Sequence, residues 1–102
     1  MTERTYIRVF WIHESPTDPI DLWSELDESR FETRKLEYFR DGRVGYASKT
    51  EEAEGTRLGI GPPIPPLDII ASDPQFSPEE VSVQAFEDRW RSRKLTGHPH
   101  ST

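Results

Sequence analysis

The chain has 102 residues, of which 32% are hydrophobic and 11% aromatic, and its 19 acidic and 13 basic residues give a formal net charge of −6. This length predicts one domain with a modest core, which large aromatic side chains must help to fill. The acidic balance argues against a nucleic-acid binder, which usually carries a basic patch, and it permits a basic protein partner.

The sequence contains no cysteine, which excludes disulfides and thiolate chemistry. Residues 1–4 include no apolar segment of the signal-peptide type, and no stretch of the chain reaches the length of a membrane span. We therefore expect a cytoplasmic protein that does not enter a membrane. We also expect one domain over residues 1–95 and a disordered tail over residues 96–102.

The first predicted strand, residues 5–13, reads TYIRVFWIH and carries large apolar groups on both faces. A six-residue turn, ESPTDP, separates it from residues 20–27, IDLWSELD, in which apolar and polar positions alternate. The short loop between them predicts an antiparallel hairpin that pairs Phe10 with Trp23 and Arg8 with Glu25. Each such cross-strand pair contributes about 0.2–1 kcal/mol.

A second hairpin is predicted around the Asp-Gly pair at residues 41–42, which is the strongest short hairpin signal. A two-residue turn joins a strand over residues 31–40 to one over residues 43–48 and pairs Tyr38 with Gly45. The opposite face of this hairpin then carries Phe39, Val44 and Tyr46. The loop between residues 27 and 31 leaves two registers open: three loop residues put Leu36 beside Leu22, which we prefer, and a four-residue turn puts Arg34 opposite Trp23.

The second half of the chain contains a proline-rich segment and a helix. Residues 62–67, PPIPPL, must be extended, and residues 67–72 have room for one helical turn. Residues 77–94 form the main predicted helix, which begins with a capping box at Ser77, with Ser82 as an alternative N-cap. The predicted fold is therefore α+β, a four-stranded antiparallel meander with one main C-terminal helix and a proline-rich crossing segment.

The first strand also predicts how the two faces of the sheet are covered. We expect Ile7, Val9 and Trp11 to pack against the helix residues Val83, Phe86 and Trp90. The other face, with Tyr6, Arg8, Phe10 and Ile12, is then covered either by the proline-rich segment or by a partner.

The order of motifs YIRVFWIH, SELD, ETRKLEYFRDGRVGYA, PPIPPL and FEDRW resembles a small uncharacterised bacterial domain family over about residues 6–90. The resemblance implies a single small domain and supplies no catalytic residues. It also suggests an association with toxin-immunity genes.

Two clusters of polar residues are candidates for a site. His13 could bind a metal or act as an acid or base, but a local hydrogen-bonding role at the strand end is preferred, and no metal or other cofactor is expected. Glu25, Glu32 and Arg34 could line a polar pocket of a ligand-binding domain or enzyme, or they could form an ion-pair lattice, which we prefer. No nucleophile or phosphate-loop motif is present, so we assign no catalytic residue.

The function we favour is a protein–protein interaction module, in the form of an immunity-type inhibitor of a basic partner. Its anchors would be aromatic side chains and arginines, because these dominate interface energetics. The candidates are Phe10, Trp23, Phe39, Tyr46, Arg34, Arg40 and Arg43. The alternatives are a small ligand-binding domain or enzyme that uses His13, Glu25 and Glu32, and a homodimer that buries the second face of the sheet.

Overall fold

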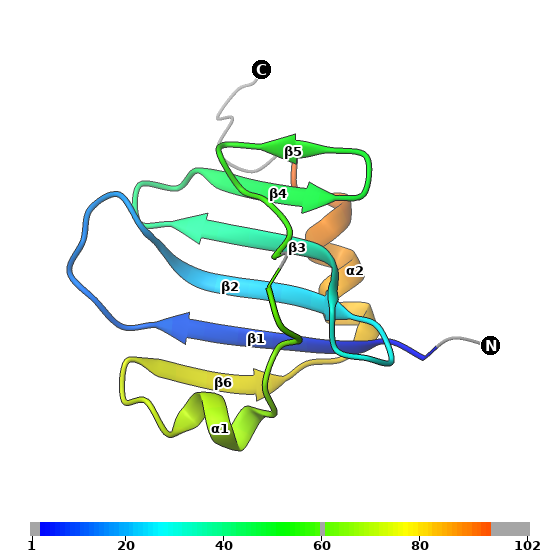
Figure 1. Ribbon diagram of the computed structural model, residues 1–102. Helices are drawn as coiled ribbons and strands as arrows, with labels where there is room; N and C mark the ends of the chain where they lie inside the picture. Colours follow the sequence, from blue (N-terminus) through cyan, green and yellow to red (C-terminus); the bar gives the residue numbers. More distant parts are fainter. Residues whose placement is uncertain (1–2, 60, 95–102) are drawn as a thin grey trace.

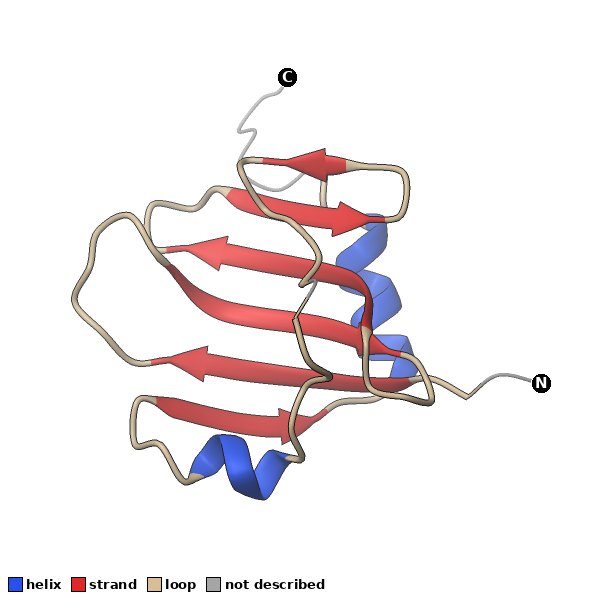
Figure 2. Ribbon diagram, in the orientation of Figure 1, coloured by secondary structure: helices blue, strands red, loops and turns tan. Residues whose placement is uncertain are grey.

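The computed structural model describes residues 3–59 and 61–94. Within these residues, six strands form one antiparallel sheet in the order β5-β4-β3-β2-β1-β6, with a helix against each face (Figures 1 and 2). The elements are β1 (Thr5–Trp11), β2 (Pro19–Leu26), β3 (Glu32–Phe39), β4 (Val44–Ser48), β5 (Glu52–Ala53), α1 (Leu67–Ala71), β6 (Phe76–Glu80) and α2 (Val83–Arg91).

The α+β class and the antiparallel sheet are confirmed, but the four-stranded meander is wrong. The largest difference is β6, which occupies residues that the sequence assigned to the first turn of the helix. β6 pairs with β1, and the Ile12 N–H donates to Gln75 O at 2.7 Å while the Val81 N–H donates to Tyr6 O at 2.9 Å. Pairing satisfies the free backbone edge of β1, and Pro78 is tolerated because β6 is itself an edge strand.

The main helix therefore begins later than the preferred capping box predicted. α2 starts at Val83, and the Ser82 hydroxyl accepts the backbone N–H of Ala85 at 3.0 Å. The alternative N-cap at Ser82 is correct and the start at Ser77 is wrong, because residues 76–80 are extended in β6.

The assignment of the two sheet faces is reversed. α2 covers the face with Tyr6 and Trp23, where Phe86 is fully buried and its ring lies 5.2 Å from that of Tyr6. The crossing segment and α1 cover the other face, where Ile64 and Ile70 pack against Ile7. The reversal follows from β6, because the chain leaves that strand beside Tyr6 and enters α2 on the aromatic face.

Both hairpin registers differ from the prediction. In the first, Arg8 lies opposite Trp23 and Tyr6 opposite Glu25, a shift of two residues from the expected pairs. Because side chains alternate along a strand, this even shift keeps every residue on its predicted face. β1 ends at Trp11 and β2 begins at Pro19, so residues 12–18 connect the two strands in place of the predicted six-residue loop over residues 14–19.

In the second hairpin the shift is one residue, which changes faces. The Phe39 N–H donates to Arg43 O, the Gly42 N–H donates to Phe39 O, and Gly42 has φ 96°. These bonds define a three-residue turn with glycine in the left-handed region, whereas the prediction assumed two residues. Tyr38 therefore pairs with Val44 rather than Gly45.

The connection between β2 and β3 has the preferred three residues. The Asp27 N–H donates to Phe31 O at 3.0 Å, and Arg30 ends the turn with φ 67°. A bulge next to Glu25 then changes the register, so Leu36 lies opposite Trp23 rather than beside Leu22. Both registers considered from the sequence are therefore wrong, because neither included a bulge.

Candidate functional site

The α2 face of the sheet contains a buried ion-pair cluster around Arg34. Arg34 lies opposite Glu25 on the neighbouring strand and donates to both of its carboxylate oxygens, at 2.8 and 2.7 Å. It also donates to Glu87 on α2, at 3.2 and 2.5 Å. Tyr6 and Thr33 donate their hydroxyl groups to Glu25 at 2.9 and 2.7 Å. Glu25 is only 7% exposed, so this cluster fastens α2 to the sheet.

The same cluster determines the charge of Glu25. Burial raises the pKa of the Glu25 carboxyl group, but hydrogen bonds from Arg34, Thr33 and Tyr6 outweigh it and lower the pKa from 4.5 to about 2. A carboxylate that stays ionised and has its oxygens occupied is poorly suited to acid–base catalysis near neutral pH. This geometry fits the ion-pair lattice that we preferred over a reactive pocket.

Arginine and aromatic side chains alternate in two stacks on this face. In the first, Arg34 lies over the rings of Phe86 and Trp90, and Arg93 lies over Trp90 and Tyr46, with the guanidinium carbon 4.1–5.1 Å from each ring centroid. Such contacts contribute about 0.5–2 kcal/mol each. Tyr46 and Arg34 therefore pack against α2 and the residues that follow it, and they stabilise its position on the sheet.

The second stack lies beside the first. Arg8 lies over Phe10 and Trp23, at 4.1 and 4.9 Å, and Arg89 of α2 lies over Trp23 and Tyr38, at 4.6 and 5.2 Å. Trp23 is only 4% exposed, so it cannot serve as a surface anchor. Phe10, at the end of the stack, is 39% exposed.

The remaining sequence candidates lie apart from this cluster. His13 follows β1, where its Nε2 is 2.8 Å from Pro19 O and its Nδ1 accepts the Ser15 N–H at 3.0 Å. This environment fits the local role preferred from the sequence. Arg40 donates to His13 O at 2.8 Å. Arg43 lies over the ring of Phe39, which is buried on the face opposite α2.

Glu25 and Glu32 lie on opposite faces of the sheet, although both line a polar pocket of about 480 Å³ with Arg34. Glu32 accepts the Ser24 hydroxyl at 3.1 Å and the Gly59 N–H at 2.8 Å. His13 is not part of this pocket, because it follows the far end of β1 from the Tyr6–Glu25 pair. The structure thus pairs Glu25 with Arg34, places Glu32 at the same pocket from the other face of the sheet, and leaves His13 apart.

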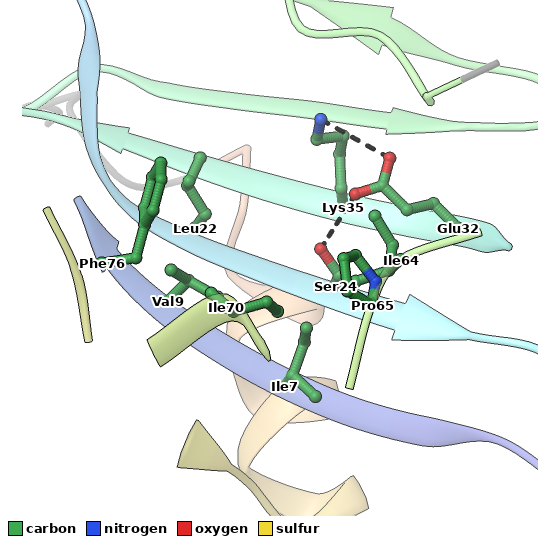
Figure 3. Close-up of a pocket in the computed structure, with 10 residues that line it drawn as sticks. All are labelled: Ile7, Val9, Leu22, Ser24, Glu32, Lys35, Ile64, Pro65, Ile70 and Phe76. Atoms are coloured by element: carbon green, nitrogen blue, oxygen red, sulfur yellow. Dashed lines mark hydrogen bonds and ion pairs between the residues drawn. The ribbon is translucent and has the colours of Figure 1, made fainter. Parts of the chain in front are cut away.

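A second pocket lies between the sheet and the crossing segment and measures about 250 Å³ (Figure 3). Its floor is formed by Ile7, Val9, Leu22 and Ser24 of β1 and β2. Its cover is formed by Ile64 and Pro65 of the crossing segment and Ile70 of α1. Phe76 of the edge strand β6 lies at one end, and Glu32 and Lys35 of β3 lie at the other. Sequence analysis missed this site, because it placed the proline-rich segment over the other face.

Comparison with protein families matches residues 5–95 to a family described as a domain of unknown function, DUF6881. The chain belongs to this family. The resemblance to an uncharacterised domain family is therefore confirmed. No curated protein and no solved structure matches the chain.

The charge of this DUF6881 domain is concentrated on one side, a feature that sequence analysis also missed. The segment between Arg57 and Arg89 contains no lysine or arginine, and the acidic and basic residues in the rest of the chain balance. The acidic residues of the segment are Asp68, Asp73, Glu79, Glu80, Glu87 and Asp88. The signal was present in the sequence as a long interval without basic residues, and it was overlooked because the acidic residues do not form a run.

The structure places α1 and β6 of this segment at one edge of the DUF6881 sheet, whereas the crossing segment runs over one face and α2 lies against the other (Figure 1). Glu87 is paired with Arg34, and Asp88 with Arg91. We call the remaining four residues, Asp68, Asp73, Glu79 and Glu80, the acidic side. Of these, only Glu79 forms an ion pair among the described residues, at 3.8 Å from Arg8.

Two further features are absent from the described part of the DUF6881 chain. It contains no group of three or more histidine, cysteine, aspartate or glutamate residues placed to hold a metal ion. It also contains no helix that is long and apolar enough to cross a membrane.

Proposed function

We propose that this protein is a cytoplasmic, non-catalytic interaction module that binds a basic protein, in the manner of an immunity-type inhibitor, through its acidic side. The observation that carries the proposal is the location of the charge. The excess of acidic residues over the whole chain lies between Arg57 and Arg89, and four of the six acidic residues of this segment lie in or between α1 and β6, at one edge of the fold. Such an asymmetry attracts a basic partner and accelerates its association.

Exposed apolar side chains near the acidic side provide anchors. Ile69 on α1 is 55% exposed, Val83 at the start of α2 is 53% exposed, and Phe10 lies opposite Ser77 of β6. Isolated apolar residues surrounded by charge are typical of an interface with an apolar centre and a polar rim. Of the four aromatic anchors predicted from the sequence, Phe10 is the one we propose as an anchor for the partner.

The partner would bind through side chains rather than by adding a strand to the sheet. The Val81 N–H donates to Tyr6 O, so the backbone N–H and C=O groups of the odd-numbered residues of β6 point toward β1. The backbone groups of the even-numbered residues point outward, toward an incoming strand. Of the outward positions, Pro78 has no N–H and the Phe76 N–H already donates to Asp73 O. This edge offers few donors to an incoming strand.

The test is a charge reversal with a matched control. We expect the immobilised protein to retain a basic protein from a lysate of its source organism, with retention that falls as salt is raised. The Asp68→Lys/Glu80→Lys variant should lose that protein. A Glu52→Lys/Glu54→Lys variant carries the same change of charge at exposed positions in and just after β5, at the opposite edge of the sheet, and should retain it. Equal retention by both variants, or retention of acidic proteins only, would contradict the proposal.

A homodimer is the competing outcome. Two copies that met through the acidic side would repel each other, so we expect a monomer by light scattering at physiological salt. A dimer that the charge-reversal variant preserves would instead favour a structural role for self-association.

A further inference from the structure

The pocket beneath the crossing segment is held open by specific contacts. Arg30, at the end of the β2–β3 turn, donates from Nε to Ile64 O and from Nη2 to Pro65 O, both at 2.8 Å. The Ile64 N–H donates back to Arg30 O, also at 2.8 Å. These three bonds fix the cover at a set height over Ile7 and Val9. The space of about 250 Å³ lies beneath this tethered part of the cover.

The one cation in the pocket lining is Lys35 (Figure 3). Its side chain is 16% exposed, and its Nζ lies 3.6 Å from Glu32 Oε1 and 3.6 Å from Glu37 Oε2. Both separations exceed hydrogen-bond length, and Lys35 Nζ makes no hydrogen bond to any other described residue. The Lys35 ammonium group can therefore still donate a hydrogen bond to a ligand.

The neighbouring carboxylates are already satisfied by other groups. Glu32 accepts from Ser24 and Gly59, and Glu37 accepts the Thr56 hydroxyl at 2.7 Å. Two carboxylates around one ammonium group leave a net negative charge at this end of the pocket. An anionic ligand would add to that charge, whereas a neutral acceptor would fill the lysine donors without repulsion.

We propose that this pocket binds a neutral, largely apolar small molecule with one hydrogen-bond acceptor directed at Lys35. The apolar part would lie between Val9 and Leu22 of the sheet and Ile70 of α1. Because an apolar cavity of about 150 Å³ holds benzene, a pocket of this volume takes a molecule of roughly ten non-hydrogen atoms. This site is separate from the acidic side and does not depend on a protein partner.

The experiment uses three probes of equal size: acetophenone, isopropylbenzene and benzoate. They share a phenyl ring and carry a neutral acceptor, no acceptor and a negative charge, respectively. Binding to the full chain is followed by shifts of backbone amide signals in NMR titrations. Acetophenone should shift the amides of Val9, Leu22 and Ile70 and bind about tenfold more tightly than isopropylbenzene, with benzoate weakest.

Two pairs of variants test the location and the role of the lysine. Ile70→Trp should fill the pocket and abolish acetophenone binding, whereas Ile69→Trp, one residue away at an exposed position, should leave it unchanged. Lys35→Met should remove the preference for acetophenone over isopropylbenzene, and Lys49→Met, the same change at an exposed lysine, should keep it.

The proposal is overturned if no probe shifts these amides in the wild-type protein, if isopropylbenzene binds as tightly as acetophenone, or if benzoate binds most tightly. It is also overturned if Ile70→Trp, with a wild-type amide spectrum elsewhere, still binds acetophenone. Because the Ile70 and Ile69 variants introduce the same large side chain on one helix, a general effect of tryptophan on folding would appear in both.

Discussion

Arg34 and Glu25 face each other across β3 and β2 in a two-pronged contact, with Nε 2.8 Å from Oε1 and Nη2 2.7 Å from Oε2. Glu87 of α2 completes the set from the other side. The pair thus joins two strands and the helix at one point. Because it is largely buried, removing one partner leaves the other charge without compensation.

The first prediction concerns the two carboxylates of this cluster. Glu25→Gln should lower the free energy of unfolding by about 3 kcal/mol, because Arg34 then keeps a buried charge with only a partly exposed partner. Glu87→Gln should cost less than about 1 kcal/mol, since a more exposed ion pair contributes little. Urea unfolding of both variants measures the difference. Equal losses would mean that Glu25 has no special role in stability.

The second prediction is a pH dependence of stability. The pKa of Glu25 in the folded protein is about 2, below its usual 4.5, so its contribution is fully present above about pH 4.5 and is lost as the pH falls toward 2. The loss should approach roughly 3 kcal/mol. Unfolding measured from pH 6 to pH 2 should show a steeper decline for the wild type than for Glu25→Gln. Parallel curves would contradict the assignment.

The third prediction separates the two N-caps considered from the sequence. Ser82→Ala should lower the free energy of unfolding by about 1 kcal/mol, because the Ser82 hydroxyl accepts the Ala85 N–H. Ser77→Ala, the same change at an exposed position in β6, should change it by less than about 0.5 kcal/mol. Thermal unfolding distinguishes them. A larger effect at Ser77 would indicate that the helix starts there.

The caps illustrate what could be predicted from sequence alone. Local patterns located β1 to β4 and the body of α2, since alternation and helical spacing are properties of neighbouring residues. The pattern at Ser77 was equally good locally, but the backbone edge of β1 outweighed it. That edge is a tertiary feature, and no signal near Ser77 reveals it.

The side-chain cluster was predictable in its members and less so in its geometry. Trp23 and Glu25 share a face by alternation along β2, and Arg8 stays on that face because the first hairpin slipped by an even number of residues. Arg34 joins them only because the bulge beside Glu25 changes the register of β3, since the register preferred from the sequence put Arg34 on the other face. The bulge beside Glu25 and the three-residue turn at Gly42 could not be derived, since Asp-Gly suits turns of either length. The pocket at Lys35 depends on which face the proline-rich segment crosses, and the sequence left that choice open.

The fourth prediction tests the contacts that hold the pocket cover. Arg30→Asn tolerates the positive φ of this position but removes the bonds to Ile64 O and Pro65 O. It should lower the free energy of unfolding by about 1–2 kcal/mol and speed hydrogen exchange at the Ile64 N–H. Arg57→Asn is the control, because Arg57 is exposed and forms only a 3.9 Å ion pair with Glu52. Unchanged exchange at Ile64 would show that Arg30 does not hold the cover.

The fifth prediction concerns Gly45, which lies against the buried side chain of Thr56. A Cβ at this position would be 2.0 Å from Thr56 Oγ1, and that hydroxyl donates to Glu37 at 2.7 Å. Gly45→Ala should therefore lower the free energy of unfolding by about 2–3 kcal/mol, as overpacking does. Gly61→Ala, where a Cβ meets nothing within 4 Å, should change it by less than about 0.5 kcal/mol.

A double variant tests whether that contact is the cause. Thr56→Ala removes the atom nearest to the new Cβ, so Gly45→Ala should cost less in the Thr56→Ala background than in the wild type. The two changes would then be non-additive, by about 1 kcal/mol or more, in denaturant unfolding of the four proteins. Additive losses would place the effect of Gly45 in its backbone rather than in its contact with Thr56. Since Thr56 also bonds to Glu37 beside Lys35, the cycle further reports how firmly that carboxylate is held at the end of the pocket.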